Sequence, residues 1–403
     1  MILGIDASNL RIGGGVTHLV ELLRAAKPEK HGFNEVVVWG GTSTLSQLEL
    51  RPWLRCVHEP LLDRPLPVRL FWQRYLLDHL ARSAKCTVLF VPGGSFSGAF
   101  RPFITMSRNM LPFESREALR YGLSPMLLRC ILLRRVQAES FRKANGVVFL
   151  TQYAHDAVMK TIKGNCAKVA IIPHGVDKRF HCLPRQQEAS WVYSSQHPIR
   201  VLYVSTIDFY KHQWCVVEAV GRLRALGVPI ELDLIGTARP SALRRLERAL
   251  RKHDPGGQYL HYVGSRPYAE LSDFYHQADI FVYASSCENM PNILLEAMVA
   301  GLPIACSSRG PMPEMLGDAG VYFDPEKIDS ISQAIKTLID DSDLRRSKAV
   351  AAYARGCDYT WDRCAKRTFT FLRLIASGSV NPEAARVIPE THGAMAYELW
   401  TRR

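Results

Sequence analysis

The sequence predicts an α/β protein built from two Rossmann-like parallel-sheet domains that face each other across a cleft. At 403 residues the chain is too long for one typical core. Short apolar strands alternate with amphipathic stretches of helix length, the pattern of βαβ units. A polar, irregular stretch over residues 181–198 separates two such series. Ligands of open α/β sheets bind at the carboxyl ends of the strands, so the cleft is the expected site.

The strands are expected at regular intervals in both halves of the chain. In the first half they are Ile2–Asp6, Val36–Trp39, Thr87–Val91, Phe103–Met106, Gly146–Leu150 and Val169–Ile172, and in the second they are Arg200–Val204, Glu231–Ile235, Tyr259–Val263, Ile280–Ala284, Pro303–Cys306 and Val321–Phe323. We therefore predict an N-terminal domain over residues 1–180, a linker over 181–198 and a C-terminal domain over 199–360. A further helix is expected over 361–376, followed by a tail over 377–403.

Positive charge is concentrated in the first half of the chain. Residues 1–190 hold 26 Lys or Arg and 14 Asp or Glu, whereas the remaining residues hold 25 and 24. A basic half favours a polyanionic partner such as an anionic membrane or a lipid diphosphate. The alternative is a solvated basic surface that maintains solubility. No aromatic–basic recognition motif accompanies the charge, so no nucleic-acid partner is expected.

The composition also bears on compartment and cofactors. No stretch approaches eighteen uninterrupted apolar residues, and the first residues read as a strand rather than a signal peptide, so we expect a cytoplasmic protein. The ten cysteines form no C-x-x-C pair, and the histidines show no paired spacing. Asp341 and Asp343 match a D-x-D pattern, but they lie in a polar stretch between helices. We therefore expect neither a metal nor a cofactor.

The segment 283–303 carries the strongest chemical signal. A strand is followed by a short polar loop and by a helix that should begin near Pro291 and end near Ala300, before Gly301 and Pro303. The free N–H groups at the start of such a helix favour a diphosphate. Glu288 on the loop and Glu296 on the helix can accept hydrogen bonds from sugar hydroxyls, each contributing about 1.5–3 kcal/mol.

This segment resembles the E-x7-E signature of retaining glycosyltransferases of family 4, which have the GT-B architecture. The resemblance implies a nucleoside diphosphate sugar as donor substrate, bound by the C-terminal domain, and an acceptor bound by the N-terminal domain. It also places Glu288 beside the transferred sugar and Glu296 beside the nucleotide ribose. The residues between them that it assigns to donor binding are Asn289, Met290, Pro291, Asn292 and Ile293.

The resemblance extends over most of the chain. Residues 171–177 are similar to the family's interdomain I-P-N-G-V-D element, with His174 in place of Asn. Residues 307–314, 320–325 and 359–361 also match family segments. In that family the helix that begins near Trp361 crosses back onto the first domain.

One positive charge of the family's diphosphate clamp is present and one is absent. Lys211 follows the strand Arg200–Val204 and corresponds to the phosphate-binding lysine of the family. Thr206 stands where the family commonly has Arg. Either another cation, with Arg266 as the candidate, replaces it, or the clamp is weaker.

Gly13, Gly14 and Gly15 lie between the first strand and a helix beginning near Val16. They do not form a dinucleotide fingerprint, because position 18 is His and no acidic residue closes the second strand. The family's glycine-rich loop at this place borders the donor diphosphate, so Gly14 and Gly15 are assigned to donor binding. The alternative is an ordinary turn.

Arg108 and Asn109 replace the His-Asp pair that many relatives carry after the fourth strand, so no general base can be assigned there. We assign Arg108, Asn109 and His174 to the acceptor side. Retention needs no separate base if the leaving phosphate takes the acceptor proton. Asn109 would then position a sugar hydroxyl and would join Glu288 and Lys211 as a catalytic residue.

Two basic amphipathic stretches, 66–85 and 123–143, could lie on an anionic membrane. The alternative is an ordinary Rossmann helix with one face in the core, which we favour for 66–85. We thus expect a retaining, metal-independent hexosyltransferase, with a mannose-like sugar and a lipid-linked or polysaccharide acceptor, that binds peripherally to the inner membrane face. The alternatives are an epimerase or phosphorylase of the same fold, or a non-catalytic binding protein with a degenerate site.

Overall fold

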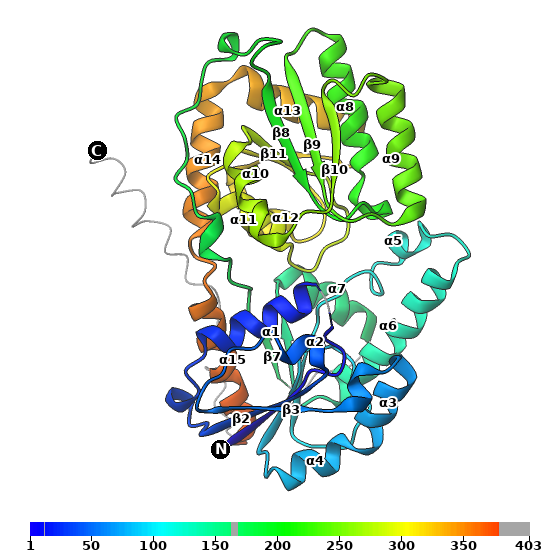
Figure 1. The fold of residues 1–403 in the computed structure, drawn as a ribbon, viewed down its shortest axis with the longest axis vertical. Helices are drawn as coiled ribbons and strands as arrows, with labels where there is room; N and C mark the ends of the chain where they lie inside the picture. Colours follow the sequence, from blue (N-terminus) through cyan, green and yellow to red (C-terminus); the bar gives the residue numbers. More distant parts are fainter. Residues whose placement is uncertain (12, 163–167, 379–403) are drawn as a thin grey trace. The chain divides into compact units, whose positions relative to one another are not determined.

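The computed structural model describes residues 1–11, 13–162 and 168–378, which form two compact units (Figure 1). Of the described residues, the first unit contains those of Met1–Ala118, Gly122–Gly175 and 360–378, and the second contains Leu119–Tyr121 and Val176–Tyr359. Residues 181–198, expected to form a linker, belong to the second unit. Most of the expected tail lies outside the described residues. Each unit is a parallel sheet with helices, so the predicted fold class is confirmed.

The sheet of the first unit has seven parallel strands in the order β3-β2-β1-β4-β5-β6-β7. Their bounds are β1 Ile2–Asp6, β2 Glu35–Gly40, β3 Leu54–His58, β4 Val88–Val91, β5 Phe103–Met106, β6 Gly146–Phe149 and β7 Val169–Ile171. The central strands are apolar throughout because helices cover both faces of a parallel sheet. The sequence did not predict β3, since this edge strand is partly exposed and includes Arg55 and His58.

Eight α-helices accompany this sheet among the described residues. They are α1 Gly14–Ala25, α2 Thr42–Leu45, α3 Leu66–Tyr75, α4 Leu77–Ser83, α5 Ser115–Leu119, α6 Pro125–Lys143, α7 Gln152–Ile162 and α15 Trp361–Ala376. The stretch 66–85 is therefore two helices. α15 comes last in the chain and packs against α1 and beside β4 and β5. Thr360 caps it by accepting a hydrogen bond from the Arg363 N–H at 3.2 Å.

The sheet of the second unit has six parallel strands in the order β10-β9-β8-β11-β12-β13. The strands are β8 Ile199–Val204, β9 Ile230–Ile235, β10 Leu260–Gly264, β11 Ile280–Tyr283, β12 Ile304–Ser307 and β13 Gly320–Phe323. The helices are α8 Gln213–Ala225, α9 Pro240–His253, α10 Leu271–Gln277, α11 Asn292–Val299, α12 Met312–Leu316, α13 Ile328–Asp340 and α14 Ser342–Gly356. All six strands expected from the sequence are present.

Helix α11 begins one residue later than expected, because Pro291 is its N-cap with extended backbone rather than its first helical residue. The helix is buried from Leu294 to Val299. Gly301 follows it with φ 69°, the left-handed conformation that ends many helices. A Cβ at Gly301 would lie 2.7 Å from the Cys182 carbonyl oxygen, so only glycine fits this turn.

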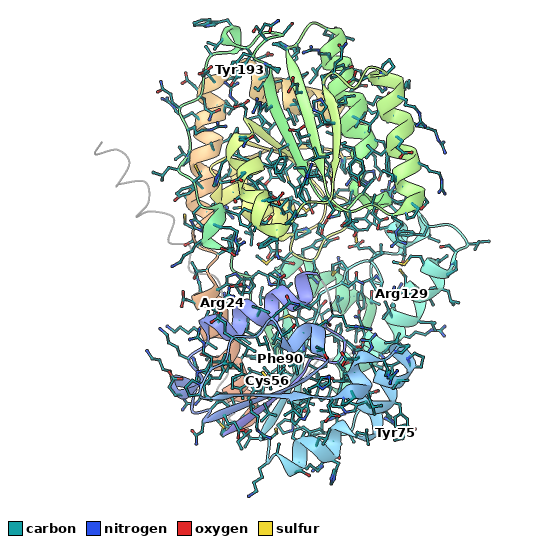
Figure 2. The ribbon with its side chains drawn as sticks, viewed as in Figure 1. Arg24, Cys56, Tyr75, Phe90, Arg129 and Tyr193 are labelled. Carbon is teal, nitrogen blue, oxygen red and sulfur yellow. The ribbon has the colours of Figure 1, made fainter. Side chains whose placement is uncertain are left out.

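Asp341 lies between α13 and α14, as expected from the sequence. Its carboxylate caps α14 by accepting a hydrogen bond from the Leu344 N–H at 2.8 Å. Asp343 is highly exposed. None of the described helices is both long enough and apolar enough to cross a bilayer. Figure 2 shows the side chains that fill the two units.

Candidate active site

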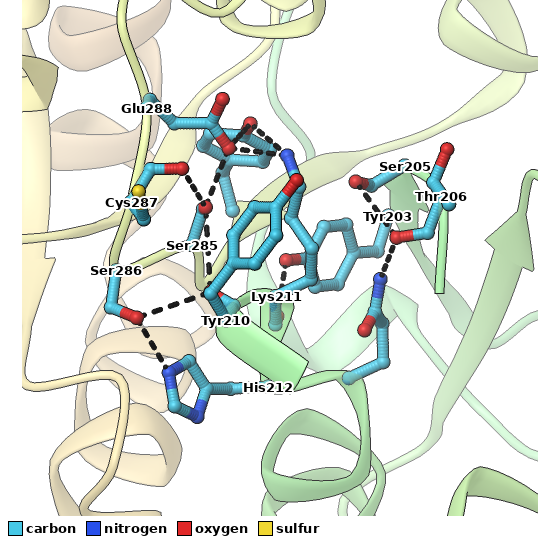
Figure 3. A network of polar contacts seen from close by, with 12 residues as sticks. Tyr203, Ser205, Thr206, Tyr210, Lys211, His212, Ser285, Ser286, Cys287 and Glu288 are labelled. Carbon is cyan, nitrogen blue, oxygen red and sulfur yellow. Dashed lines mark hydrogen bonds and ion pairs between the residues drawn. The ribbon is translucent and has the colours of Figure 1, made fainter. Parts of the chain in front are cut away.

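The carboxyl ends of β8 and β11, which are neighbours in the sheet, bring a cation and a carboxylate together. The loop after β8 carries Lys211, and the loop after β11 carries Glu288. The Lys211 ammonium forms an ion pair with Glu288 Oε1 (Figure 3). Both side chains are largely shielded from solvent, with 7% and 14% exposure. The parallel pairing of β8 with β11 thus joins two residues that are far apart in the sequence.

Lys211, Tyr283 and Ser285 all contact one oxygen atom, Glu288 Oε1. It accepts hydrogen bonds from the Tyr283 hydroxyl at 2.7 Å and the Ser285 hydroxyl at 2.5 Å. Lys211 Nζ also donates to the Tyr283 oxygen at 3.0 Å. The second oxygen, Oε2, has no hydrogen bond to any described residue. Oε1 is therefore fixed by the protein, while Oε2 can accept a hydrogen bond from a ligand.

The backbone around Lys211 is held from several sides. Asp208 accepts a hydrogen bond from the Phe209 N–H at 2.8 Å and so caps the short helix Phe209–Lys211. The Tyr203 hydroxyl donates to the Lys211 carbonyl at 2.5 Å. His212 has φ 50°, which is uncommon for a residue with a side chain, and its Nε2 lies 2.9 Å from Ser286 Oγ. These contacts preorganise the position of the lysine.

The two positions considered for the second cation differ in their surroundings. Thr206 is exposed, and its hydroxyl lies 3.1 Å from that of Thr237. Arg266 is exposed on the loop after β10 and forms no ion pair or hydrogen bond with the described residues. The structure therefore does not bring Arg266 into the Lys211–Glu288 network.

Arg239, which the sequence interpretation did not single out, lies closer to this network. Its Nε is 3.2 Å from Asp208 Oδ2, three residues before Lys211, and its side chain is 37% exposed. Its backbone N–H donates to the Ile207 carbonyl at 3.0 Å. The signal that could have found it is its place after β9, the strand beside β8. The carboxyl ends of adjacent parallel strands meet at one edge of the sheet.

Glu296 lies on α11 in a pocket of tyrosines. Oε1 accepts a hydrogen bond from the Tyr268 hydroxyl at 3.2 Å, and Oε2 accepts one from Tyr275 at 3.0 Å. Burial raises the pKa of Glu296 to about 7, and the two tyrosine hydrogen bonds partly offset that effect. The Asp177 carboxylate raises this pKa further, while Arg179 lowers it. Glu296 thus changes its charge near neutral pH.

The five residues assigned to donor binding between the two glutamates form the turn into α11. Asn289 and Met290 are buried, as is Pro291 at the N-cap. The Asn292 side-chain oxygen is buried and has no hydrogen-bond partner among the described residues. Ile293 is in the first turn, where N–H groups lack partners within the helix. The start of α11 therefore offers the Asn292 side-chain oxygen and the first N–H groups of the helix as unpaired polar groups.

In the first unit, Arg108 is bound to the glycine loop. Its guanidinium donates to the carbonyl oxygens of Gly14 and Gly15, which open α1, the latter at 3.2 Å. Burial lowers the pKa of Arg108 to about 10, so it remains a cation at neutral pH. Asn109 is exposed, and its side-chain oxygen accepts a hydrogen bond from the Leu111 N–H at 3.1 Å. Unlike this oxygen, the amide N–H₂ of Asn109 has no hydrogen bond to the described residues.

His174 differs in character from Arg108 and Asn109, because it is only 4% exposed. Its ring lies 4.9 Å from that of His18 and 5.9 Å from that of Trp361, measured between centroids. Burial, aided by the charge of Arg108, lowers its pKa to about 3, so the imidazole is neutral. In this position His174 packs against α1 and α15, and it presents little surface to an acceptor.

The fold of the chain is shared with solved structures of other proteins. A solved structure of sucrose-phosphate synthase from Thermosynechococcus elongatus superimposes with a TM-score of 0.73 at 16% identity, covering 94% of this chain and all of that one. The identity is too low to transfer an activity, but the likeness establishes the GT-B fold.

Residues 186–355, which make up most of the second unit, match the family model described as glycosyl transferases group 1. The O-antigen chain mannosyltransferase B of Escherichia coli is 32% identical over 117 residues, which is 29% of this chain and 31% of that protein. The glycogen synthase of Mycobacterium tuberculosis is 25% identical over 64% of this chain and 62% of its own length. The chain thus spans from about a third to three-fifths of these relatives.

Proposed function

We propose that this chain is a retaining glycosyltransferase that moves a hexosyl unit from a nucleoside diphosphate sugar to a hydroxyl group. The observation that carries the proposal is the buried Lys211–Glu288 pair at the carboxyl ends of β8 and β11. Glu296 follows it on α11. The family of residues 186–355 and the GT-B fold support the same class of enzyme.

The second unit would bind the donor. The N–H groups that open α11, together with Lys211, suit a diphosphate, because both offer positive charge to an anion. Glu296 would accept hydrogen bonds from the ribose hydroxyls once a ligand competes with Tyr268 and Tyr275. Glu288 Oε2 would accept one from a hydroxyl of the transferred sugar.

The transfer breaks the bond between the anomeric carbon and the diphosphate oxygen. Negative charge grows on the leaving diphosphate, and a preorganised cation such as Lys211 stabilises that charge in the transition state. This ammonium would take the role that a metal ion fills elsewhere. The acceptor oxygen forms its new bond on the face that the diphosphate leaves, and the departing phosphate oxygen takes the acceptor proton. This course preserves the anomeric configuration without a protein base.

The first unit would bind the acceptor, with Asn109 positioning a hydroxyl through its exposed amide. Its glycine loop, Gly14 and Gly15, would border the donor diphosphate. The positive charge of residues 1–190 suits a lipid diphosphate or a lipopolysaccharide core. Likeness to an O-antigen mannosyltransferase favours a mannose-like sugar. These features fit a cytoplasmic enzyme that works at the inner face of the membrane.

The test is a thermal-shift screen with UDP, GDP and ADP, followed by donor turnover with the matching hexoses. We expect one diphosphate to raise the melting temperature and its sugar conjugate to release nucleotide. Absence of a shift with all three would contradict the proposal. A new nucleotide sugar without acceptor would identify an epimerase, and phosphate-dependent cleavage a phosphorylase. Nucleotide binding without any turnover would identify a binding protein.

A further inference from the structure

Two helices of the first unit, α3 and α6, expose several large apolar side chains while they bury some polar ones. On α6, Gln137 and Ser140 are buried, while Leu128, Leu132 and Val136 are exposed. The exposed three recur every four residues and therefore share one face of the helix. Leu128 alone leaves 58% of its surface exposed. This apolar face is not the one that the core covers.

Helix α3 shows the same combination of a buried polar residue and exposed apolar residues. Gln73 is buried, whereas Leu70, Phe71 and Tyr75 are exposed. The rings of Phe71 and Tyr75 lie 5.0 Å apart, so they form one aromatic cluster in contact with solvent. Trp72, on the opposite side, is fully buried. Both helices thus bury apolar side chains such as Trp72 and Phe141 together with polar ones, and both leave further apolar residues outside.

The polar contacts show that the two helices flank one loop. Gln73 of α3 donates to the Ser95 carbonyl at 3.1 Å and accepts from the Ser97 N–H at 3.1 Å. Ser140 of α6 accepts a hydrogen bond from the Phe96 N–H at 3.1 Å. Helices α3 and α6 therefore meet at the loop that follows β4, on one side of the first unit (Figures 1 and 2).

The α3–α6 surface consists of Leu70, Phe71 and Tyr75 with Leu128, Leu132 and Val136. It belongs to a larger group that holds most of the exposed large apolar residues in the described chain. Scattered apolar residues are normal on a protein surface, whereas a contiguous group marks an interaction site. Something apolar is therefore expected to cover it.

Basic residues surround the α3–α6 surface. Residues 64–85 and residues 123–143 each contain five Lys or Arg and one acidic residue. Arg129 and Arg135 are exposed on α6 and form no ion pair with the described residues. Apolar side chains bordered by arginines are suited to the boundary between acyl chains and anionic headgroups. This charge decides between a lipid surface and a second copy of the chain, whose equal positive charge would repel.

We infer that the α3–α6 surface docks on the anionic surface of a lipid bilayer, with its apolar residues inserted and Arg129 and Arg135 at the headgroups. The docking deepens the proposed function, because a lipid-linked acceptor would be met at that surface. It stands on its own contacts, however, and is measured separately from transfer.

The experiment is flotation of the full chain with phosphatidylglycerol-containing vesicles and with neutral phosphatidylcholine vesicles. Each basic residue near an anionic surface strengthens binding about fivefold, so Arg129→Gln with Arg135→Gln should weaken it roughly 10- to 30-fold on anionic vesicles only. Leu128→Ser with Leu132→Ser should weaken binding to anionic vesicles roughly tenfold or more, because transfer of apolar surface is lost. All four side chains are exposed, so the variants should fold.

Matched controls lie elsewhere on the surface. Leu50→Ser with Leu226→Ser removes leucines that are even more exposed than Leu128 and Leu132, and Arg251→Gln with Lys252→Gln removes exposed charges from α9. Both controls should bind within twofold of the wild type. Equal binding by patch and control variants would overturn the inference, as would absence of wild-type binding. A dimer that the leucine variants dissociate, without vesicle binding, would assign the surface to a second copy instead.

Thermal shift with nucleotide diphosphates in the same samples separates this inference from the proposed function. Vesicle binding without a nucleotide response would remove the proposed function and leave the docking surface. A nucleotide response without vesicle binding would remove the docking surface and leave the proposed function.

Discussion

Each acidic group of the candidate site is shaped by its partners, and these partners give the site its chemistry. The spacing of Glu288 and Glu296 was visible in the sequence, but the tyrosines that bind Glu296 were not. Tyr268 and Tyr275 come from other elements, and only the fold brings them to Glu296, whereas Tyr283 lies five residues before Glu288 in the motif itself. The same reason explains why Arg239 was missed and Arg266 was suggested. The spacing of residues in the sequence identifies a motif, whereas contacts with residues of distant elements can be recognised only in the structure.

Lys211→Met should weaken binding of the nucleoside diphosphate far more than binding of the monophosphate. The substitution keeps an unbranched side chain and removes a charged hydrogen bond of about 1.5–3 kcal/mol, which corresponds to roughly 10- to 150-fold in affinity. Titration calorimetry with both nucleotides gives the difference. Lys252→Met, on the exposed end of α9, is the control and should change nothing. An equal loss for both nucleotides would indicate that Lys211 does not face the diphosphate.

Nucleotide affinity should increase as the pH rises through about 7, because ionised Glu296 accepts stronger, charge-assisted hydrogen bonds from the ribose than the protonated carboxyl does. Below that pKa, protonation competes with the ligand and can reduce affinity by up to about tenfold per pH unit. The comparison is the dissociation constant of wild type and Glu296→Gln across about pH 6 to 8. The phosphates of the nucleotide titrate in the same way with the variant, so the comparison isolates the effect of Glu296. Parallel pH profiles would show that Glu296 is not the group concerned.

The same raised pKa affects stability in the opposite sense. A carboxyl whose pKa is higher in the folded than in the unfolded protein holds its proton more tightly when folded. Its contribution to the free energy of unfolding is full below the unfolded pKa and is lost as the pH rises through about 7. The tyrosine contacts that support Glu296 therefore moderate a cost to folding at the pH where the ribose is best bound.

At the scale of elements, the parallel strands were predictable because apolar runs buried on both faces have few alternatives. Strand β3 was not, since its partly exposed edge position tolerates Arg55 and His58. The start of α11 was misplaced by one residue because Pro suits both the N-cap boundary and the first turn. The sequence also could not show which side chains of α3 and α6 are exposed. Basic and apolar residues were visible there, but which of them face water depends on how the helices pack.

Gly175→Ala should destabilise the first unit, because its Cβ would lie 2.2 Å from the backbone nitrogen of Trp361 at the start of α15. Overpacking of this kind costs about 1–3 kcal/mol, and backbone has little room to yield. Chemical denaturation followed by tryptophan fluorescence would measure the loss. Gly14→Ala is the control, since its Cβ would meet only Arg108 at 3.8 Å. Equal stability of both variants would show that α15 is not held this closely.

At the scale of the whole molecule, each unit has a parallel sheet and its own polar site, and charge is distributed unequally along the chain. The first 190 residues carry nearly all of the excess positive charge. The sequence alone revealed this division and the two-domain class. Assignment of the acceptor could not follow from it, because Arg108 binds the glycine loop and His174 is buried. Only Asn109 among the expected acceptor residues is exposed.

Turnover should be unaffected by a chelator. The proposed donor site supplies positive charge from Lys211, and in the described part of the chain no group of three or more His, Cys, Asp or Glu is arranged to hold a metal ion. The measurement is nucleotide release with and without EDTA, which we expect to agree within about twofold, too small a difference to represent a lost charge contact. Loss of activity that Mg²⁺ or Mn²⁺ restores would show that Lys211 does not act alone on the diphosphate.

The central claim is that Glu288, held by Lys211, Tyr283 and Ser285, acts on the sugar of a nucleoside diphosphate donor. The most direct test compares turnover and donor affinity of wild type, Glu288→Gln and the control Glu247→Gln with the donor identified by thermal shift. We predict that Glu288→Gln loses roughly a hundredfold or more in turnover, as does removal of a preorganised charged group from other active sites, while donor affinity changes little. Glu247→Gln should behave as wild type. Turnover by Glu288→Gln close to that of the wild type would contradict the account.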